Sequence, residues 1–209
     1  MYRLQRFIYD PTRRWYLLGR DELIAHLDVP ADGSVLELAC GTGRNLVRIG
    51  ERAPGAALYG LELSREMLKS ARANCRRAGM VQRTTLAVGD ASTFDAAVVF
   101  GCRGQFDRIV ISYALSMIPA WHAVVDRGIE LLTPNGSLHI VDFGDGGGLP
   151  DRANRVLRGW LGWFHVEPRS EAPAYLRQRG RAVQARMEVH WIARGYAWRA
   201  ALYRGACNP

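Results

Sequence analysis

The chain has 209 residues, of which 48% are hydrophobic and 23% are charged, so it is long enough to fold around an apolar core. No stretch reaches the roughly 18 uninterrupted apolar residues of a membrane-spanning helix, and the first residues do not resemble a secretory signal. The net charge of +8 favours an anionic partner, nucleic acid or a membrane face, although a solvated basic face would carry it equally. The four cysteines lack metal-ligand or redox spacing, so we expect reduced thiols, no metal and a cytoplasmic protein.

Apolar, β-rich runs alternate with helical patterns along most of the chain. Five such runs are Ser34–Leu38, Ala57–Leu61, Thr84–Val88, Arg108–Ser112 and Ser137–Val141. Asp95–Phe106 is expected to be a surface loop. Two later runs, Met187–Ala193 and Tyr196–Arg204, are joined at Arg194-Gly195 and predict an antiparallel hairpin. The order predicts an α/β fold, a doubly wound, mostly parallel seven-stranded sheet with a C-terminal antiparallel hairpin.

Three helices are indicated between these runs. Asn45–Ala53 follows the first run directly. Ser64 can cap a second helix, in which apolar residues from Met67 onward recur at helical spacing. A third pattern begins at Trp121, and Pro134-Asn135-Gly136 is expected to stop it.

A glycine-bearing turn links the first run to its helix and reads Glu-Leu-Ala-Cys-Gly-Thr-Gly-Arg-Asn over residues 37–45. A strand, turn and helix of this kind presents backbone N–H groups to a nucleotide, either a dinucleotide or S-adenosylmethionine. The last glycine of the dinucleotide fingerprint and the lysine of a Walker loop are both missing. Glu37 would repel a pyrophosphate but attract a cationic methionine group, and Glu62 can accept both ribose hydroxyls, so S-adenosylmethionine is favoured.

Polar residues also end the later runs. Asp90 can accept a hydrogen bond from an adenine amino group, while Ser112-Tyr113 and Asp142 end the fourth and fifth runs. Because ligands of open parallel sheets lie at the carboxyl ends of the strands, these residues predict one site.

With these motifs the chain resembles class I S-adenosylmethionine-dependent methyltransferases, which implies a Rossmann-like fold. ELACGTGRN, GLELS and VGDAS match three of their motifs, with Ala39 in place of the usual first glycine. YDPTRRWYLLGRDELI, SYALSMIPAW, HIVDFGD and LGWFHVEPR more narrowly resemble bacterial diacylglycerylhomoserine N-methyltransferases, relatives of phosphatidylethanolamine N-methyltransferases that make betaine lipids. The implied cofactor contacts are Tyr16, Arg20, Glu37, Ala39, Gly41, Thr42, Gly43, Asn45, Glu62, Leu63, Met67, Asp90, Ala91, Ser112 and Met117.

The resemblance also implies acceptor contacts. Aromatic rings suit a methylated ammonium through cation–π attraction, which makes Tyr9, Tyr16 and Tyr113 candidates, with Tyr9 and Tyr113 as the catalytic pair. Further candidates, of which the basic ones would hold a homoserine carboxylate, are Arg20, Asp142, His165 and Arg169. His139, inside an apolar run, is expected to be a core histidine.

Two segments resemble membrane-interface elements: the N-terminus, with aromatic residues between arginines, and Pro150–Phe164. In the second, Trp160, Trp163 and Phe164 share one helical face, with arginines opposite. The alternative is a helix that packs this face on the sheet. We expect one domain, 1–209, with a membrane-facing cap (1–27), a cofactor-binding core (28–145) and an amphipathic helix plus hairpin (146–209).

The leading hypothesis is a peripheral enzyme on the cytoplasmic membrane face that methylates the amino group of diacylglycerylhomoserine up to three times. Its expected partners are an aminolipid, an anionic membrane surface and a homoserine-lipid-forming enzyme, without nucleic acid. The alternatives are phosphatidylethanolamine or another aminolipid, RNA or a small amine, and a non-enzymatic adaptor. The fourth run is followed by Ser-Tyr-Ala-Leu rather than Asn-Pro-Pro-Tyr, which argues against methylation of a nucleic-acid base.

Overall fold

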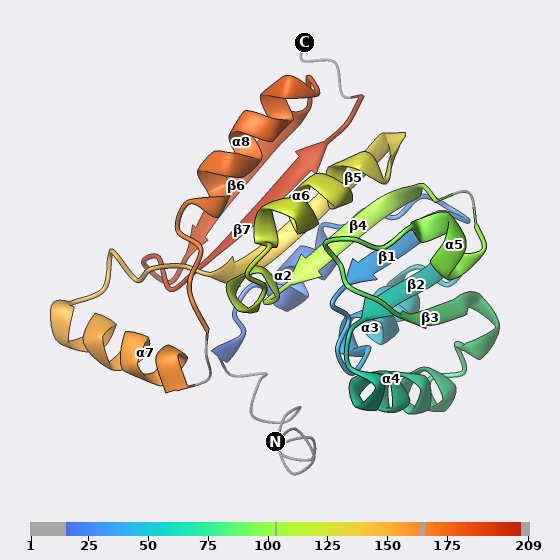
Figure 1. Ribbon diagram of the computed structural model, residues 1–209, viewed down its shortest axis with the longest axis horizontal. Coiled ribbons are helices and arrows are strands. Elements are labelled where there is room, and N and C mark those ends of the chain that lie inside the picture. The colour runs from blue at the N-terminus through green and yellow to red at the C-terminus, as the bar shows by residue number, and fades with distance from the viewer. Residues whose placement is uncertain (1–15, 103, 164–165, 206–209) are drawn as a thin grey trace.

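The computed structural model describes residues 16–102, 104–163 and 166–205, which form a seven-stranded sheet covered by helices (Figure 1). The strand order is β3-β2-β1-β4-β5-β7-β6. Strands β1 to β5 pair in parallel, whereas β7 pairs antiparallel with both β5 and β6. The strands are β1 (Ser34–Leu38), β2 (Ala57–Glu62), β3 (Thr84–Val88), β4 (Phe106–Ser112), β5 (Leu132–Phe143), β6 (Arg186–Ile192) and β7 (Ala197–Tyr203). The predicted fold class, including the closing hairpin, is confirmed.

Helices bury both faces of the sheet, and Figure 1 shows α6 and α8 in front of it with α2 behind. One apolar cluster includes residues of α2 (Arg20–Ala25), α3 (Arg44–Arg52) and α4 (Arg65–Arg77). The opposite cluster includes residues of α5 (Ala96–Phe100), α6 (Trp121–Glu130) and α8 (Ala172–Ala182). Two short 3-10 helices, η2 (Val81–Arg83) and η3 (Leu115–Met117), lie in connections. The remaining helix, α7 (Asp151–Trp163), extends beyond the sheet in this view.

Strand β1 shows why the central strands read as nearly continuous apolar runs. Val35 belongs to the cluster under α2, α3 and α4, whereas Leu36 and Leu38 belong to the cluster under α5, α6 and α8. Parallel strands in the middle of such a sheet are buried on both faces, so alternation of polar and apolar residues is lost. Because side chains alternate along a strand, Glu37 lies on the same face as Val35, toward α3.

The expected surface loop at Asp95–Phe106 is wrong in part, because the structure contains α5 within it. The Asp95 carboxylate caps this helix by accepting hydrogen bonds from the backbone amides of Ala97 and Val98, at 2.9 and 3.1 Å. Phe100 at its end packs edge-on against Tyr59, with ring centroids 5.4 Å apart. A helix of five residues is too short to show a helical period in the sequence.

The predicted stop at Pro134-Asn135-Gly136 is also misplaced. Helix α6 ends earlier, at Glu130, and these three residues lie within β5. They interrupt the ladder with β4, because Phe106 pairs with Leu132 whereas Arg108 pairs with Ser137. Proline lacks the N–H of a regular ladder and is tolerated at such an irregularity.

His139 is the core histidine that the sequence predicts. Only 3% of its surface is exposed, and its Nε2 lies 2.8 Å from the Ser137 hydroxyl. Burial lowers the pKa of His139 to about 3. The residue is therefore neutral and structural.

Candidate cofactor site

The turn between β1 and α3 uses left-handed backbone at three positions. The φ angles of Ala39, Gly41 and Gly43 are +57°, +55° and +73°. A Cβ added at Gly41 would meet no protein atom within 4 Å, so this backbone faces open space that a ligand can approach. At Gly43, the added atom would lie 3.1 Å from the Ala71 Cβ, so this glycine lets α3 pack closely on α4. Ala39 adopts a conformation that costs a non-glycine residue roughly 1 kcal/mol.

The Glu62 carboxylate joins the turns that follow β1 and β2. One oxygen accepts a hydrogen bond from the Gly41 amide and the other from the Ser64 amide, both at 2.9 Å. Ser64 in turn caps α4, since its hydroxyl accepts from the Met67 amide at 3.3 Å. The predicted ribose carboxylate and the predicted glycine turn are thus in direct contact.

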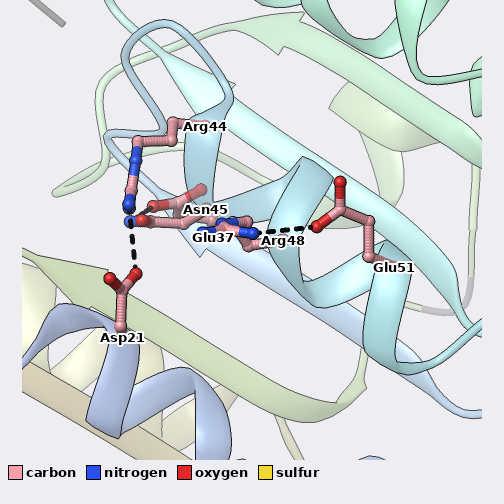
Figure 2. Close-up of polar contacts among 6 residues, drawn as sticks. All are labelled: Asp21, Glu37, Arg44, Asn45, Arg48 and Glu51. Carbon is pink, nitrogen blue, oxygen red and sulfur yellow. Dashed lines mark hydrogen bonds and ion pairs between the residues drawn. The ribbon is translucent and has the colours of Figure 1, made fainter. Parts of the chain in front are cut away.

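Glu37 is a buried acid directly below the glycine turn. Only 2% of its surface is exposed, and one carboxylate oxygen accepts a 2.7 Å hydrogen bond from the Asn45 side chain (Figure 2). Burial raises the pKa of Glu37 to about 8, while the positive charge of Arg20 opposes the shift. Among the described residues no hydrogen-bond donor reaches its other oxygen, Oε2. A buried acceptor of this kind suits the cationic part of S-adenosylmethionine.

The other predicted cofactor residues lie along the same strand ends. Leu63 directly follows β2 and is 68% exposed, while Met67 is half-buried at the start of α4. Asp90, after β3, is exposed, and hydrogen bonds from the Ser92 hydroxyl and amide lower its pKa. The next residue, Ala91, is buried.

Thr42 is held from α4, because its carbonyl accepts a 2.8 Å hydrogen bond from the Asn74 side chain. Arg44, which begins α3, forms an ion pair of 3.1 Å with Asp21 of α2 (Figure 2). The glycine turn is therefore connected to both α2 and α4.

Tyr113, the predicted catalytic tyrosine, lies at the carboxyl end of β4 but is 5% exposed. Its hydroxyl donates a 2.6 Å hydrogen bond to the Leu18 carbonyl, and its ring packs on Phe143 with centroids 4.6 Å apart. Burial raises its pKa further above the ordinary tyrosine value. The hydroxyl thus has a structural partner on the segment before α2, a relationship that the sequence did not indicate.

Asp142 is likewise buried, with 1% exposed, and its two oxygens accept from the amides of Phe143 and Ser116 at 2.7 and 3.2 Å. Burial raises the pKa of Asp142 to about 6. Ser116 belongs to η3, so this carboxylate holds the 3-10 turn that presents Met117, which is 47% exposed. Ser112, the last residue of β4, is half-buried beside it.

Arg169, a predicted acceptor contact, also touches η3. Its guanidinium pairs with Glu167 at 2.8 Å and donates to the Leu115 carbonyl at 3.4 Å. Three predicted site residues, Tyr9, Phe164 and His165, lie outside the described residues, as do the side chain of Trp160 and the rest of the N-terminal segment before Tyr16.

The apolar residues of helix α7 differ in their burial. Leu161 is 1% exposed and Leu157 packs on the same core cluster, whereas Val156 and Trp163 are 73% and 83% exposed. Part of the helix therefore packs on the protein, through Leu157 and Leu161, while Val156 and Trp163 remain exposed. Among the helices that the structure describes, none combines the length and hydropathy that a bilayer crossing requires.

A family of known proteins matches the part of the chain that holds this site. The family described as "Methyltransferase domain" matches residues 35–136. Methyltransferase GfsG of Streptomyces halstedii is 31% identical over 140 residues, which are 67% of this chain and 48% of that protein. A ubiquinone/menaquinone biosynthesis C-methyltransferase UbiE of Cereibacter sphaeroides is 27% identical, over 60% of this chain and 48% of its own length. The chain thus spans about half the length of these curated relatives.

The fold is shared with solved structures of low sequence identity. A SAM-dependent methyltransferase from Aquifex aeolicus superimposes with a TM-score of 0.68 at 14% identity, over 95% of both chains. The fold, the glycine turn and the family match together indicate that residues 35–136 form a methyltransferase domain of the class I, S-adenosylmethionine-dependent type. Its cofactor is S-adenosylmethionine, and the open backbone at Gly41 and the buried Glu37 oxygen fit that cofactor.

Proposed function

We propose that the chain is an S-adenosylmethionine-dependent N-methyltransferase that methylates the amino group of diacylglycerylhomoserine up to three times. The observation that carries this proposal is the apolar character of the carboxyl edge of the sheet. Leu63 follows β2 and Met117 follows β4, and they are 68% and 47% exposed. Helix α7 follows β5 and exposes most of Val156 and Trp163. Exposed apolar side chains beside a ligand site suit an acceptor with hydrocarbon chains.

The surplus of basic residues supports an acceptor presented on an anionic surface. The chain carries 28 lysines and arginines against 20 acidic residues, and Arg152 and Arg155 are exposed on α7 beside the outward apolar residues. A helix with exposed aromatic and basic residues binds at a bilayer interface. Peripheral association with the cytoplasmic membrane face, and partnership with an enzyme that supplies the homoserine lipid, belong to this proposal.

The protein groups at the strand ends suit an amine acceptor. S-Adenosylmethionine supplies a methyl group bonded to a positively charged sulfur. The amine lone pair forms the new C–N bond as the C–S bond breaks, so the amine must arrive unprotonated but needs no further activation. Tyr113 and Asp142 are buried and hydrogen-bonded, so neither is placed to take a proton from a phenol or a carbon acid. Burial at an apolar edge favours the neutral amine.

Two other acceptors fit the same apolar edge. Phosphatidylethanolamine carries an amine on a similar lipid, with a phosphate in place of the carboxylate. A quinone-like acceptor is favoured by the UbiE relative, whose printed name describes a C-methyltransferase of quinone biosynthesis. That chemistry would require a base that takes a proton from the acceptor.

The experiment that tests the proposal follows labelled methyl groups from S-adenosylmethionine into lipid. Purified protein is offered diacylglycerylhomoserine, phosphatidylethanolamine or a demethylated quinone in separate anionic micelles, with Glu62→Ala as the cofactor-site control. Label on the homoserine lipid alone supports the proposal. Label only on phosphatidylethanolamine or the quinone replaces the acceptor, and label on none of the three with intact cofactor binding overturns the lipid assignment.

A further inference from the structure

Two tyrosine hydroxyls from distant parts of the chain hold the same short segment, residues 16–20. The Tyr113 hydroxyl, after β4, donates to the Leu18 carbonyl at 2.6 Å. The Tyr196 hydroxyl, just before β7, donates to the Tyr16 carbonyl at 2.8 Å. The donors and acceptors are 95 and 180 residues apart, so these bonds fix tertiary placement and not local structure.

Between these two hydrogen bonds, the segment packs against side chains of β5 and β6. Gly19 has φ +80°, and a Cβ there would lie 2.4 Å from the Ile192 Cδ1 and 3.4 Å from the Val141 Cγ2. A larger residue here would have to move the end of the Ile192 side chain and would be strained at this positive φ. Residues 16–20 therefore lie against β5 and β6 near the end of the sheet where the cofactor binds.

From this anchor the chain enters α2 and reaches the cofactor turn. Arg20 is buried, with 9% exposed, and its charge acts on Glu37. The following residue, Asp21, pairs with Arg44 at the start of α3. The position of residues 16–20 thus sets the position of the positive charge beside the buried acid of the cofactor site.

We propose that Tyr113 and Tyr196 are positioning residues for the cofactor: they clamp residues 16–20 to the sheet and so hold Arg20 and α2 against the glycine turn. Neither tyrosine needs to contact the methyl group for this role. The clamp concerns the cofactor alone, so it is independent of which acceptor is methylated. It also gives Tyr113 a different task from the catalytic one that the sequence predicts.

The test compares Tyr113→Phe, Tyr196→Phe and the double variant, each of which keeps the ring and removes the hydroxyl. Tyr175→Phe is the matched control, because its hydroxyl donates a 2.8 Å bond to Asp126 between α8 and α6. Calorimetry with S-adenosylmethionine, without any acceptor, reports the dissociation constant. We expect roughly 2- to 10-fold weaker binding for each single variant, the loss of one neutral hydrogen bond, and no change for the control.

Hydrogen exchange distinguishes a local effect on residues 16–25 from a general loss of stability. In the parent protein, S-adenosylmethionine should slow exchange of the amides of residues 16–25, and this protection should weaken in the Tyr113 and Tyr196 variants but not in Tyr175→Phe. Parent-like affinity in both single variants overturns the clamp, as does equal weakening in the control. If Tyr113→Phe does not fold, Tyr196→Phe alone decides, because Tyr196 is half-buried and its variant keeps the contact with Phe143.

Discussion

The side chain of Asn45 reaches back across the glycine turn and donates a 2.7 Å hydrogen bond to Glu37, eight residues earlier. This bond ties the first turn of α3 to the end of β1, so the turn between them is fixed at both ends. It also leaves Glu37 with one occupied oxygen and one oxygen, Oε2, that no donor of the described residues reaches. The buried acid is therefore oriented by the protein and still has capacity for a ligand.

Cofactor affinity should depend on pH through Glu37. With a pKa raised to about 8 by burial, this carboxyl is mostly protonated at pH 6, whereas a cationic ligand favours its ionised form. Binding must then release a proton, so affinity should rise with pH, by at most about tenfold per unit, and level off above pH 8. Calorimetry between pH 6 and 9 measures this slope, which Glu37→Gln should remove; an unchanged slope in the variant would assign it to another group.

Glu62→Ala should weaken S-adenosylmethionine binding by on the order of 10- to 100-fold, because a charged acceptor for ribose hydroxyls is lost. The Gly41 and Ser64 amides lose their common acceptor as well, so the two turns should loosen. Glu51→Ala is the matched control, since it removes a carboxylate that pairs with Arg48 on the surface of α3. Equal affinities of the Glu62 variant and the parent, measured by calorimetry, would refute the assignment.

Trp163→Ser, alone and with Val156→Ser, should reduce co-sedimentation with anionic vesicles about tenfold, because these exposed side chains would no longer enter the interface. Cofactor affinity should stay unchanged. Trp191→Ser removes another exposed tryptophan, 53% exposed on β6, and serves as the control. The membrane assignment of α7 fails if Trp163→Ser and its combination with Val156→Ser both sediment like the parent. It also fails if Trp191→Ser loses as much vesicle binding as Trp163→Ser.

Arg83→Met should lower the free energy of unfolding by about 2–4 kcal/mol, measured by denaturant titration. The guanidinium donates to the carbonyls of Gly50, Ala53 and Ala56 at 2.7, 3.2 and 3.1 Å, and so satisfies acceptors at the end of α3. The carbonyls of Gly50 and Ala56 would lose this donor, whereas the Ala53 carbonyl would keep the hydrogen bond that it accepts from the Ala56 amide at 3.1 Å. Arg76→Met, at an exposed position of α4, should change stability far less, and equal losses in the two variants would contradict the capping role.

Much of the sheet could be predicted because its information is local. β1 and β3 have the bounds of their apolar runs, and the spacing of Glu37 and Glu62 around the turn indicated the cofactor class. Helix α5 was missed because it is short, although Asp95 two residues before Ala97 is a local capping signal.

Other parts of the site depend on contacts that a sequence pattern does not encode. The apolar residues of helix α7 share one broad face, so the pattern alone could not decide that Leu161 is buried in the core while Trp163 is exposed. The partners of the Tyr113 and Tyr196 hydroxyls are backbone carbonyls, which every residue carries. Side-chain identity therefore gives no hint of which carbonyl accepts the bond.

The hydrogen bond between Tyr196 and Tyr16 has a consequence for the order in which the protein is completed on the ribosome. At about 5–20 residues per second, Tyr196 is synthesised roughly 10 to 35 seconds after residue 16. The glycine turn and β1 to β5 can form during that interval, but the early segment still lacks its second anchor and β7. A nascent chain that stalls before β6 and β7 are synthesised would thus bind the cofactor weakly. Tight binding would indicate that the hairpin is complete.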